Sequence, residues 1–265
     1  MKDHSILRWS GSKARLLPSL LRFAPQRFNR YVEPFVGSAA LYFAVQPSRA
    51  VLGDVNPEVI DVYRAIQENP HAVADALDSI PHDRAAYDVL RSIAPGHLDR
   101  PQRAARLIFL MKSCFNGVYR TNRSGHFNVP MGNRIYALPT RAQLELAHHR
   151  LRATDLVCSD FETTVKTSKS GDWVYLDPPY KPKGRYRGEF GYGARFTDEC
   201  MVRLLEVARK LRSKGCFVML SYKYDRDLVH HLADWHIHHA SARRSVAGHS
   251  IFRESERELI VTSYS

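Results

Sequence analysis

Residues 177–180, Asp-Pro-Pro-Tyr, place groups that suit chemistry on an aromatic amine directly after an apolar run. Asp177 supplies a carboxylate acceptor, and Pro178 offers a backbone carbonyl because proline fixes φ and has no N–H. Pro179 stiffens the turn, and Tyr180 supplies an exposed ring on which an extruded base can stack. The exocyclic amine of adenine or cytosine becomes a good nucleophile only when its hydrogens are accepted, so these residues predict an amine-directed site. For this motif alone, a simple turn at a strand end is the alternative.

The segment 32–43, VEPFVGSAALYF, has the pattern of a strand end, a glycine turn and a helix start. Such a loop lets backbone N–H groups approach a ligand closely. Gly37 is its only glycine, so the three-glycine dinucleotide fingerprint is absent. Asp54 ends the next predicted strand, near where an acidic residue binds ribose hydroxyls in nucleotide sites. Taken alone, each element is more typical of a structural turn or a helix cap.

Trp9, Gly11 and Lys13 lie just before a predicted helix, within RWSGSKARLL. A lysine at a helix N-terminus suits a carboxylate or phosphate, and Trp9 could form the wall of an adenine or methionine pocket. A solvated lysine is the alternative.

The basic stretch 113–134 contains VYRT and HFNV on either side of a turn with Ser124 and Gly125, which predicts a β-hairpin. It interleaves aromatic, cationic and amide side chains: Phe115, Tyr119, Phe127, Arg120, Arg123, Arg134, Asn116, Asn122 and Asn128. A two-stranded ribbon of this kind fits the major groove of DNA, where arginine pairs with guanine. A solvated surface hairpin is the alternative.

The composition favours a polyanionic partner, because 39 lysines and arginines face 27 aspartates and glutamates, a formal charge of +12. The four cysteines show no CxxC pair and no zinc-like histidine spacing, so we expect a reduced cytoplasmic setting and no metal. No stretch reaches the roughly 18 apolar residues of a membrane span, and we expect no membrane association.

Short apolar runs that end in polar residues predict buried strands, and helical patterns separate them. The expected strands are 30–35, 50–55, 155–160, 172–177 and 216–222, followed by two closing strands at 235–241 and 258–264. This alternation predicts an α/β doubly wound sheet of about seven strands.

The alternation of strands and helices stops between residues 57 and 154. In this segment the expected helices follow one another without a strand of the main sheet: 70–80, 83–93, 103–113 and 140–151. We therefore expect a catalytic domain of residues 1–56 and 155–265, and an inserted, mostly helical subdomain of residues 57–154 that carries the hairpin.

In order along the chain, WSGSK, EPFVGS, GDVN, FNGVYRTNRSGHFNVPMG, CSDF, LDPPY, FTDECMVRLLEVA and VMLSY resemble the motifs of the Dam family of DNA adenine-N6 methyltransferases. This is the alpha arrangement of the amino-methylating enzymes, and the resemblance runs from about residue 5 to 262. It implies a Rossmann-like methyltransferase sheet, S-adenosylmethionine as cofactor, double-stranded DNA as partner and flipping of the target adenine.

The resemblance also implies roles for particular residues. The cofactor would contact Trp9, Lys13, Phe35, Gly37, Asp54, Asp160, Phe161 and Asp177, and Asp177, Pro178, Pro179 and Tyr180 would form the catalytic motif. Arg120, helped by Val118 and Pro130, would read a guanine, and Phe115 and Asn116 would enter beside the opened base pair. Asn122, Arg123 and Asn128 complete the expected DNA-binding set, and GATC is the expected site.

Two features depart from the family pattern. Ala39 replaces the second glycine of the cofactor loop, and its methyl group could narrow the cofactor pocket. Residues 181–193 are unusually basic and glycine-rich, which indicates a loop that closes over target and cofactor, with plain disorder as the alternative.

Other functions stay open at this point. The same fold could methylate cytosine N4 or an RNA base, or could bind DNA without turnover. A Rossmann dehydrogenase is disfavoured by the missing glycines. A monomer or weak dimer is expected, and a cognate restriction endonuclease, if there is one, would act as a separate protein.

Overall fold

The computed structural model describes residues 6–122, 124–134, 136–180, 196–243 and 255–265. The strands are β1 (Tyr31–Glu33), β2 (Ala50–Asp54), β3 (Thr154–Cys158), β4 (Trp173–Leu176), β5 (Phe217–Lys223), β6 (His236–Arg243) and β7 (Ser255–Thr262). The α-helices are α1 (Leu17–Arg22), α2 (Ala40–Val45), α3 (Pro57–Glu68), α4 (Pro70–Asp78), α5 (Arg84–Ser92), α6 (Arg100–Ser113), α7 (Arg141–Leu151), α8 (Phe161–Val165), α9 (Asp198–Ser213) and α10 (Arg226–His231). Short 3₁₀ turns occupy Lys13–Arg15, Pro95–His97 and Phe115–Gly117.

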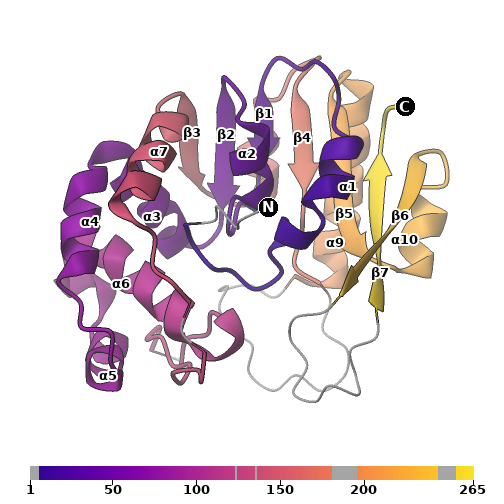
Figure 1. Cartoon of the computed structure of the whole chain (residues 1–265). Helices are drawn as coiled ribbons and strands as arrows, with labels where there is room; N and C mark the ends of the chain where they lie inside the picture. The colour runs from indigo at the N-terminus through magenta and orange to yellow at the C-terminus, as the bar shows by residue number, and fades with distance from the viewer. Residues whose placement is uncertain (1–5, 123, 135, 181–195, 244–254) are drawn as a thin grey trace.

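The seven strands form one sheet in the order β3-β2-β1-β4-β5-β7-β6, which confirms the predicted doubly wound sheet (Figure 1). Pairing is parallel from β3 to β5, and β7 is antiparallel to both of its neighbours. The chain leaves β1 toward β2 on one side and later returns to β4 on the other. Ligands bind at such a switch point, outside the carboxyl ends of the strands.

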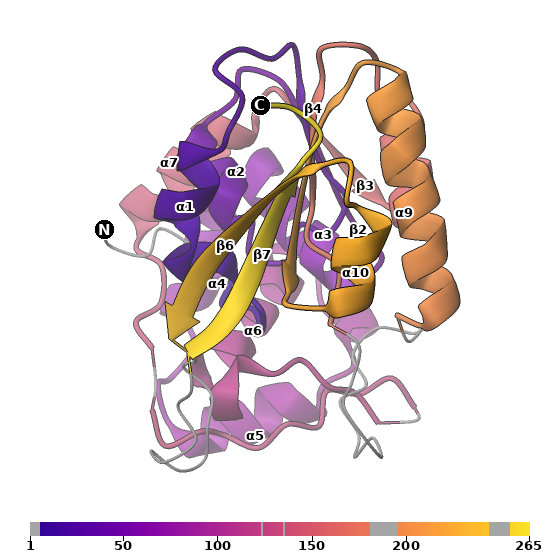
Figure 2. The ribbon, with the colours of Figure 1, turned by 90° about the vertical axis from the view of Figure 1, so that its right-hand side faces the viewer.

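Helices cover both faces of the sheet, because successive residues of a strand point to opposite faces and the residues on both faces are apolar. Tyr31 and Trp173 pack into a core with α1, α2, α3, α4, α6 and α7, while Val32 and Val174 pack into a second core with α8, α9 and α10. Strands buried on both faces are continuously apolar, as the sequence patterns are. Figure 2 shows α9 on the side of the sheet opposite to α1 and α2.

The expected helices are present, with one difference and two additions. The helix predicted to follow the Trp9–Lys13 segment is divided into the 3₁₀ turn Lys13–Arg15 and α1, because Pro18 lacks an N–H and occupies the first turn of α1. The short helices α8 and α10 follow capping residues Asp160 and Asp225 that the sequence reading did not use as helix starts. In the described part of the chain, none of the helices is long and apolar enough to cross a bilayer.

The inserted segment shares its core with the sheet. Helix α3 packs on β2 and β3 and also contacts α6 and α7. Residues of α3 and α6 belong to the same hydrophobic core as Tyr31 of β1. The division of the chain into a catalytic domain and a recognition subdomain therefore stays a prediction.

The predicted hairpin is formed by loop segments with little regular pairing. Thr121 and Phe127 form an antiparallel bridge, Asn122 N–H donates to the carbonyl of His126 at 2.8 Å, and Asn128 N–H donates to that of Arg120 at 3.0 Å. The side chain of Phe127 is buried and anchors this hairpin on the core.

Ala39 precedes α2 with a left-handed backbone, φ 53°, and is fully buried. We expect Ala39→Gly to raise the free energy of unfolding by up to about 1 kcal/mol. Relief of the left-handed conformation gains about 1–2 kcal/mol, and loss of the buried methyl group costs about 0.8 kcal/mol. Urea unfolding measures the difference. Ala44→Gly, inside α2, is the control and should lose about 1 kcal/mol. A destabilised Ala39→Gly would mean that packing of the methyl group outweighs the backbone strain.

Candidate active site

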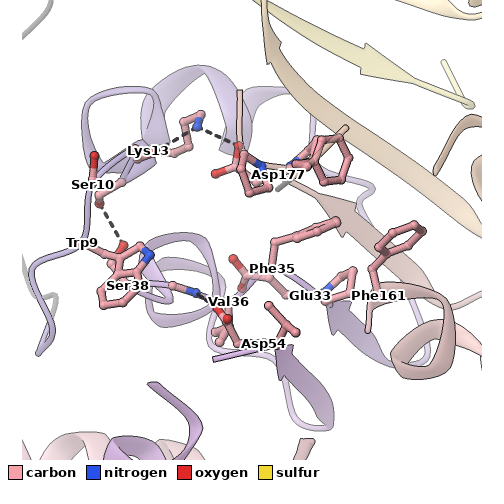
Figure 3. Close-up of a pocket in the computed structure, with 18 of the residues that line it drawn as sticks. Trp9, Ser10, Lys13, Glu33, Phe35, Val36, Ser38, Asp54, Phe161 and Asp177 are labelled. Carbon is pink, nitrogen blue, oxygen red and sulfur yellow. Dashed lines mark hydrogen bonds and ion pairs between the residues drawn. The ribbon is translucent and has the colours of Figure 1, made fainter. Parts of the chain in front are cut away.

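A cavity of about 380 Å³ opens at the carboxyl ends of β1, β2 and β4. Figure 3 shows the labelled side chains around one opening, with Lys13 and Asp177 on one side and Trp9 and Asp54 on the other. The cavity is lined by residues from segments 9–13, 33–41, 54–55, 118–119, 159–161, 175–180 and 196–200. All the residues that the sequence analysis assigned to cofactor binding and catalysis line it: Trp9, Lys13, Phe35, Gly37, Asp54, Asp160, Phe161, Asp177, Pro178, Pro179 and Tyr180.

Asp177 follows β4 directly, and its carboxylate is held by two partners. Lys13 Nζ lies 2.7 Å from Oδ1 and is only slightly exposed, while Ser221 Oγ donates to the same oxygen at 2.8 Å. Ser221, from the neighbouring strand β5, also shares a hydrogen bond of 2.8 Å with the hydroxyl of Tyr175. The carboxylate orientation is thus fixed by an ion pair and a buried hydroxyl chain.

Tyr180 is half-buried, whereas the sequence predicted an exposed ring. Its hydroxyl lies 2.8 Å from each carboxylate oxygen of Glu258 in β7. The ring lies edge-on to Tyr222, and Lys13 Nζ is 5.0 Å from the ring centroid. Burial, followed by the charges of Asp177 and Glu258, raises the pKa of Tyr180, so the phenol stays protonated and donates.

Asp54 is buried at the end of β2 and organises the glycine loop. Its Oδ2 accepts the Gly37 N–H at 3.1 Å, and its Oδ1 accepts the Asn56 N–H at 2.9 Å. Burial raises the pKa of Asp54 to about 6, although these backbone hydrogen bonds oppose the shift. A side chain at position 37 would place Cβ 2.8 Å from Cδ1 of Trp9, so the close contact of the loop with Trp9 requires glycine.

Glu33 ends β1 and joins Asp54, Asp160 and Asp177 as a fourth carboxyl group in the cavity lining, one that the sequence analysis did not single out. It is 3% exposed and accepts a hydrogen bond of 2.9 Å from the Tyr31 hydroxyl. Burial raises its pKa well above the usual range, and the charges of Asp177 and Asp54 act in the same direction. A cationic ligand would favour the ionised form of such a group.

Aromatic side chains form the remaining walls. Phe35 and Phe161 stack with ring centroids 5.5 Å apart, and Arg203 lies over Phe161 while it pairs with Asp160. Ala39 is absent from the lining, so its methyl group does not narrow the cavity. The predicted narrowing is therefore wrong, because the methyl group is buried beneath the loop.

The expected DNA-reading residues lie beside this cavity and partly in it. Val118 lines the cavity, and Phe115 is 53% exposed next to Asn116, whose backbone is left-handed with φ 55°. Arg120 Nε donates to Asn128 Oδ1 at 2.7 Å, and its Nη2 donates to the Asn128 carbonyl at 3.1 Å. The guanidinium is therefore held in one orientation.

The other members of that set have local roles in the structure. Asn122 Oδ1 accepts the N–H groups of Ser124 and His126 and so shapes the turn. The carbonyl of Pro130 accepts the Phe115 N–H at 2.9 Å. Arg123 and the whole of the predicted basic loop 181–193 lie outside the described residues.

Sequence reasoning missed the support residues Ser221, Glu258 and Glu33, and it placed Tyr119 only in the hairpin. Ser221 lies in the quoted motif VMLSY, and Glu33 lies in EPFVGS, so their motifs were visible although their roles were not. Glu258 carried no local signal, because its partner Tyr180 is distant in the chain.

Comparison with known proteins agrees with this geometry. A family model described as D12 class N6 adenine-specific DNA methyltransferase matches residues 9–246. The chain is 34% identical over 269 residues to the type II methyltransferase M1.LlaDCHI of Lactococcus lactis subsp. cremoris, covering 97% of this chain and 94% of that protein. It is 30% identical to the retron Ec67 DNA adenine methylase of Escherichia coli, over 98% of this chain and 91% of the relative.

A further relative, the DNA adenine methylase of Escherichia coli, is 28% identical over 98% of this chain and 95% of its own length. The family match spans the cavity lining, the Asp-Pro-Pro-Tyr turn and the hairpin alike. The chain belongs to the D12 class of N6 adenine-specific DNA methyltransferases.

Proposed function

We propose that this enzyme transfers a methyl group from S-adenosylmethionine to a flipped adenine in a short duplex site, with GATC as the first candidate. Family membership accounts for adenine methylation of DNA. The proposal adds the donor, base flipping, the site and the residue roles. The observation that carries it is the single cavity in which the Asp177–Tyr180 turn lies beside the Gly37 loop and Asp54.

The residues present fit S-adenosylmethionine, which supplies an electrophilic methyl group on a sulfonium centre. Asp54 is a buried acceptor suited to ribose hydroxyls, and Phe35 with Phe161 offers an aromatic wall suited to adenine. Glu33 is a buried carboxyl group near which a cation is favourable, and the ammonium of Lys13 suits a carboxylate.

Asp177 accepts a hydrogen of the target N6 amine in this proposal, and the carbonyl of Pro178 accepts the other. Lys13 and Ser221 hold the carboxylate in place, so little reorganisation accompanies the reaction. N6 would gain the methyl group as the donor's sulfonium–methyl bond broke to leave a thioether, and N6 would then lose one proton to water. Tyr180, anchored by Glu258, presents its ring to the extruded base.

Nucleoside mass spectrometry on unmethylated DNA, incubated with the protein and S-adenosylmethionine, tests the proposal. N6-methyladenine is expected, and sequencing of the modified positions shows whether the site is GATC. N4-methylcytosine would overturn the base assignment. No mark, with DNA binding intact, would favour a non-catalytic DNA-binding protein.

Asp177→Ala is expected to reduce methyl transfer by at least about 10³-fold, because it removes the acceptor on which positioning of the amine depends. Equilibrium binding to duplex DNA should persist. Asp155→Ala, which removes an exposed carboxylate of β3 outside the cavity, is the matched control and should leave turnover unchanged. Wild-type turnover by Asp177→Ala would end the catalytic assignment.

Arg120→Ala is expected to cost roughly 1–3 kcal/mol of binding free energy at the cognate site and to relax specificity at one base pair. The reason is that Asn128 holds the Arg120 guanidinium as a fixed fork. Competition binding with site variants measures the effect, and Arg84→Ala on the exposed part of α5 is the control. Equal losses on every sequence would show a phosphate contact instead.

Affinity for the donor is expected to depend on pH through Asp54. Its pKa of about 6 in the free protein means that a bound proton must leave before the carboxylate can accept ribose hydroxyls. The dissociation constant should therefore be constant above about pH 7 and rise by up to about tenfold per unit below pH 6. Calorimetry measures the dissociation constant of the donor across pH 5 to 8 (a range chosen around that pKa). The Asp54→Asn variant should bind the donor weakly, and its dissociation constant should show no inflection with pH. An inflection that persists in this variant would be assigned to Glu33.

A further inference from the structure

Tyr119 belongs to the predicted recognition hairpin, yet its ring lines the cavity assigned to the donor. It stands between Val118 and Arg120, two residues expected to read the DNA. Its ring centroid lies 5.3 Å from that of Trp9 and 5.8 Å from that of Phe127. One side chain therefore touches both the wall of the donor cavity and the anchored strand of the hairpin.

The Tyr119 hydroxyl is bonded to an ion pair of the partly buried Glu58 and the buried Arg106. It donates to Glu58 Oε1 at 2.6 Å, and Arg106 Nη1 donates to Glu58 Oε2 at 3.1 Å. Arg106 is 1% exposed, and its Nε donates to the carbonyl of Leu90 at 2.8 Å. These bonds link the ring to helices α3 and α6.

Contacts continue from the ring to the donor loop. Trp9 packs so closely on Gly37 that a Cβ there would lie 2.8 Å from Trp9 Cδ1, and the Gly37 N–H is held by Asp54. Glu58 also lies in the first turn of α3, where its N–H donates to Asn56 Oδ1, beside the same loop. Displacement of the ring would therefore change the wall that contacts the donor.

We propose that Tyr119 is a positioning residue that couples recognition of the DNA site by the hairpin to binding of the donor. The proposal rests on the proposed function. Movement of Val118 and Arg120 onto a cognate site shifts the ring between them, and the ring shifts Trp9. Since coupling between two binding sites is reciprocal, the donor strengthens cognate DNA binding by the same factor.

The test uses S-adenosylhomocysteine as a non-reactive probe of the donor cavity. Its dissociation constant is measured by calorimetry on the whole protein, alone, with a cognate duplex and with a non-cognate duplex. Wild-type protein should bind the probe at least about fivefold more tightly with cognate DNA, the lower end of usual coupling factors. DNA affinity measured with and without the probe should change by the same factor.

Tyr119→Phe keeps the ring and removes its bond to Glu58. We expect the coupling factor to fall to below about twofold, while affinity for the probe alone changes by less than about threefold. Tyr87→Phe is the matched control, because that buried tyrosine also donates to the hairpin, at the Val129 carbonyl, but does not line the cavity. It should retain wild-type coupling.

Three results would overturn the proposal. The first is a wild-type coupling factor below about twofold, and the second is a coupling factor of Tyr119→Phe equal to that of the wild type. The third is an equal loss of probe affinity by Tyr119→Phe with and without DNA, which would mean that the residue has only a structural role. If Tyr119→Phe does not fold, Glu58→Gln, which keeps the side-chain shape, should show the same loss. A wild-type protein that methylates adenine but shows no coupling would refute only this inference, whereas absence of methylation would refute the proposed function.

Discussion

The parallel pairing of β1 between β2 and β4 is the constraint on which the site depends. Because these strands run in the same direction, their carboxyl ends meet at one edge, and Glu33, Asp54 and Asp177 line one cavity there. Burial disfavours the ionised form and raises the pKa of both Glu33 and Asp54, and for Glu33 the neighbouring charges of Asp177 and Asp54 act in the same direction. Such a site favours a ligand that brings positive charge.

The three carboxyl groups are held in different ways, and the differences separate their roles. Asp177 has the ammonium of Lys13 and the hydroxyl of Ser221 on one oxygen, so it is oriented by a cation. Asp54 is held by backbone N–H groups, which tie it to the shape of the glycine loop. Glu33 is buried and accepts a hydrogen bond from the hydroxyl of Tyr31. Environment rather than residue type thus distinguishes neighbouring acids.

The helical insertion packs on the same core as the sheet, which gives the hairpin a firm base close to the cavity. The buried ring of Phe127 anchors the hairpin on the core, and the ion pair of Glu58 and Arg106 is bonded to the hydroxyl of Tyr119. Under the proposed function, target reading and donor binding would share a wall formed by Tyr119 and Trp9, whose ring centroids lie 5.3 Å apart. Close-packed interiors transmit small displacements, so a shared wall is a physical route between two sites.

The sequence by itself determined the strands, most helices and the identity of the cavity-lining motifs. Buried strands are visible in the sequence as apolar runs. The Asp177–Tyr180 turn and Gly37 are recognisable because proline restricts the backbone conformations of the chain and glycine widens them. Only the tertiary structure decided which side chains meet: Lys13 with Asp177, Tyr180 with Glu258 and Tyr119 with Glu58. It also decided that the Ala39 methyl group lies outside the cavity. Local patterns record periodicity and turn chemistry, whereas contacts between distant segments follow from strand order and core packing, which no single segment encodes.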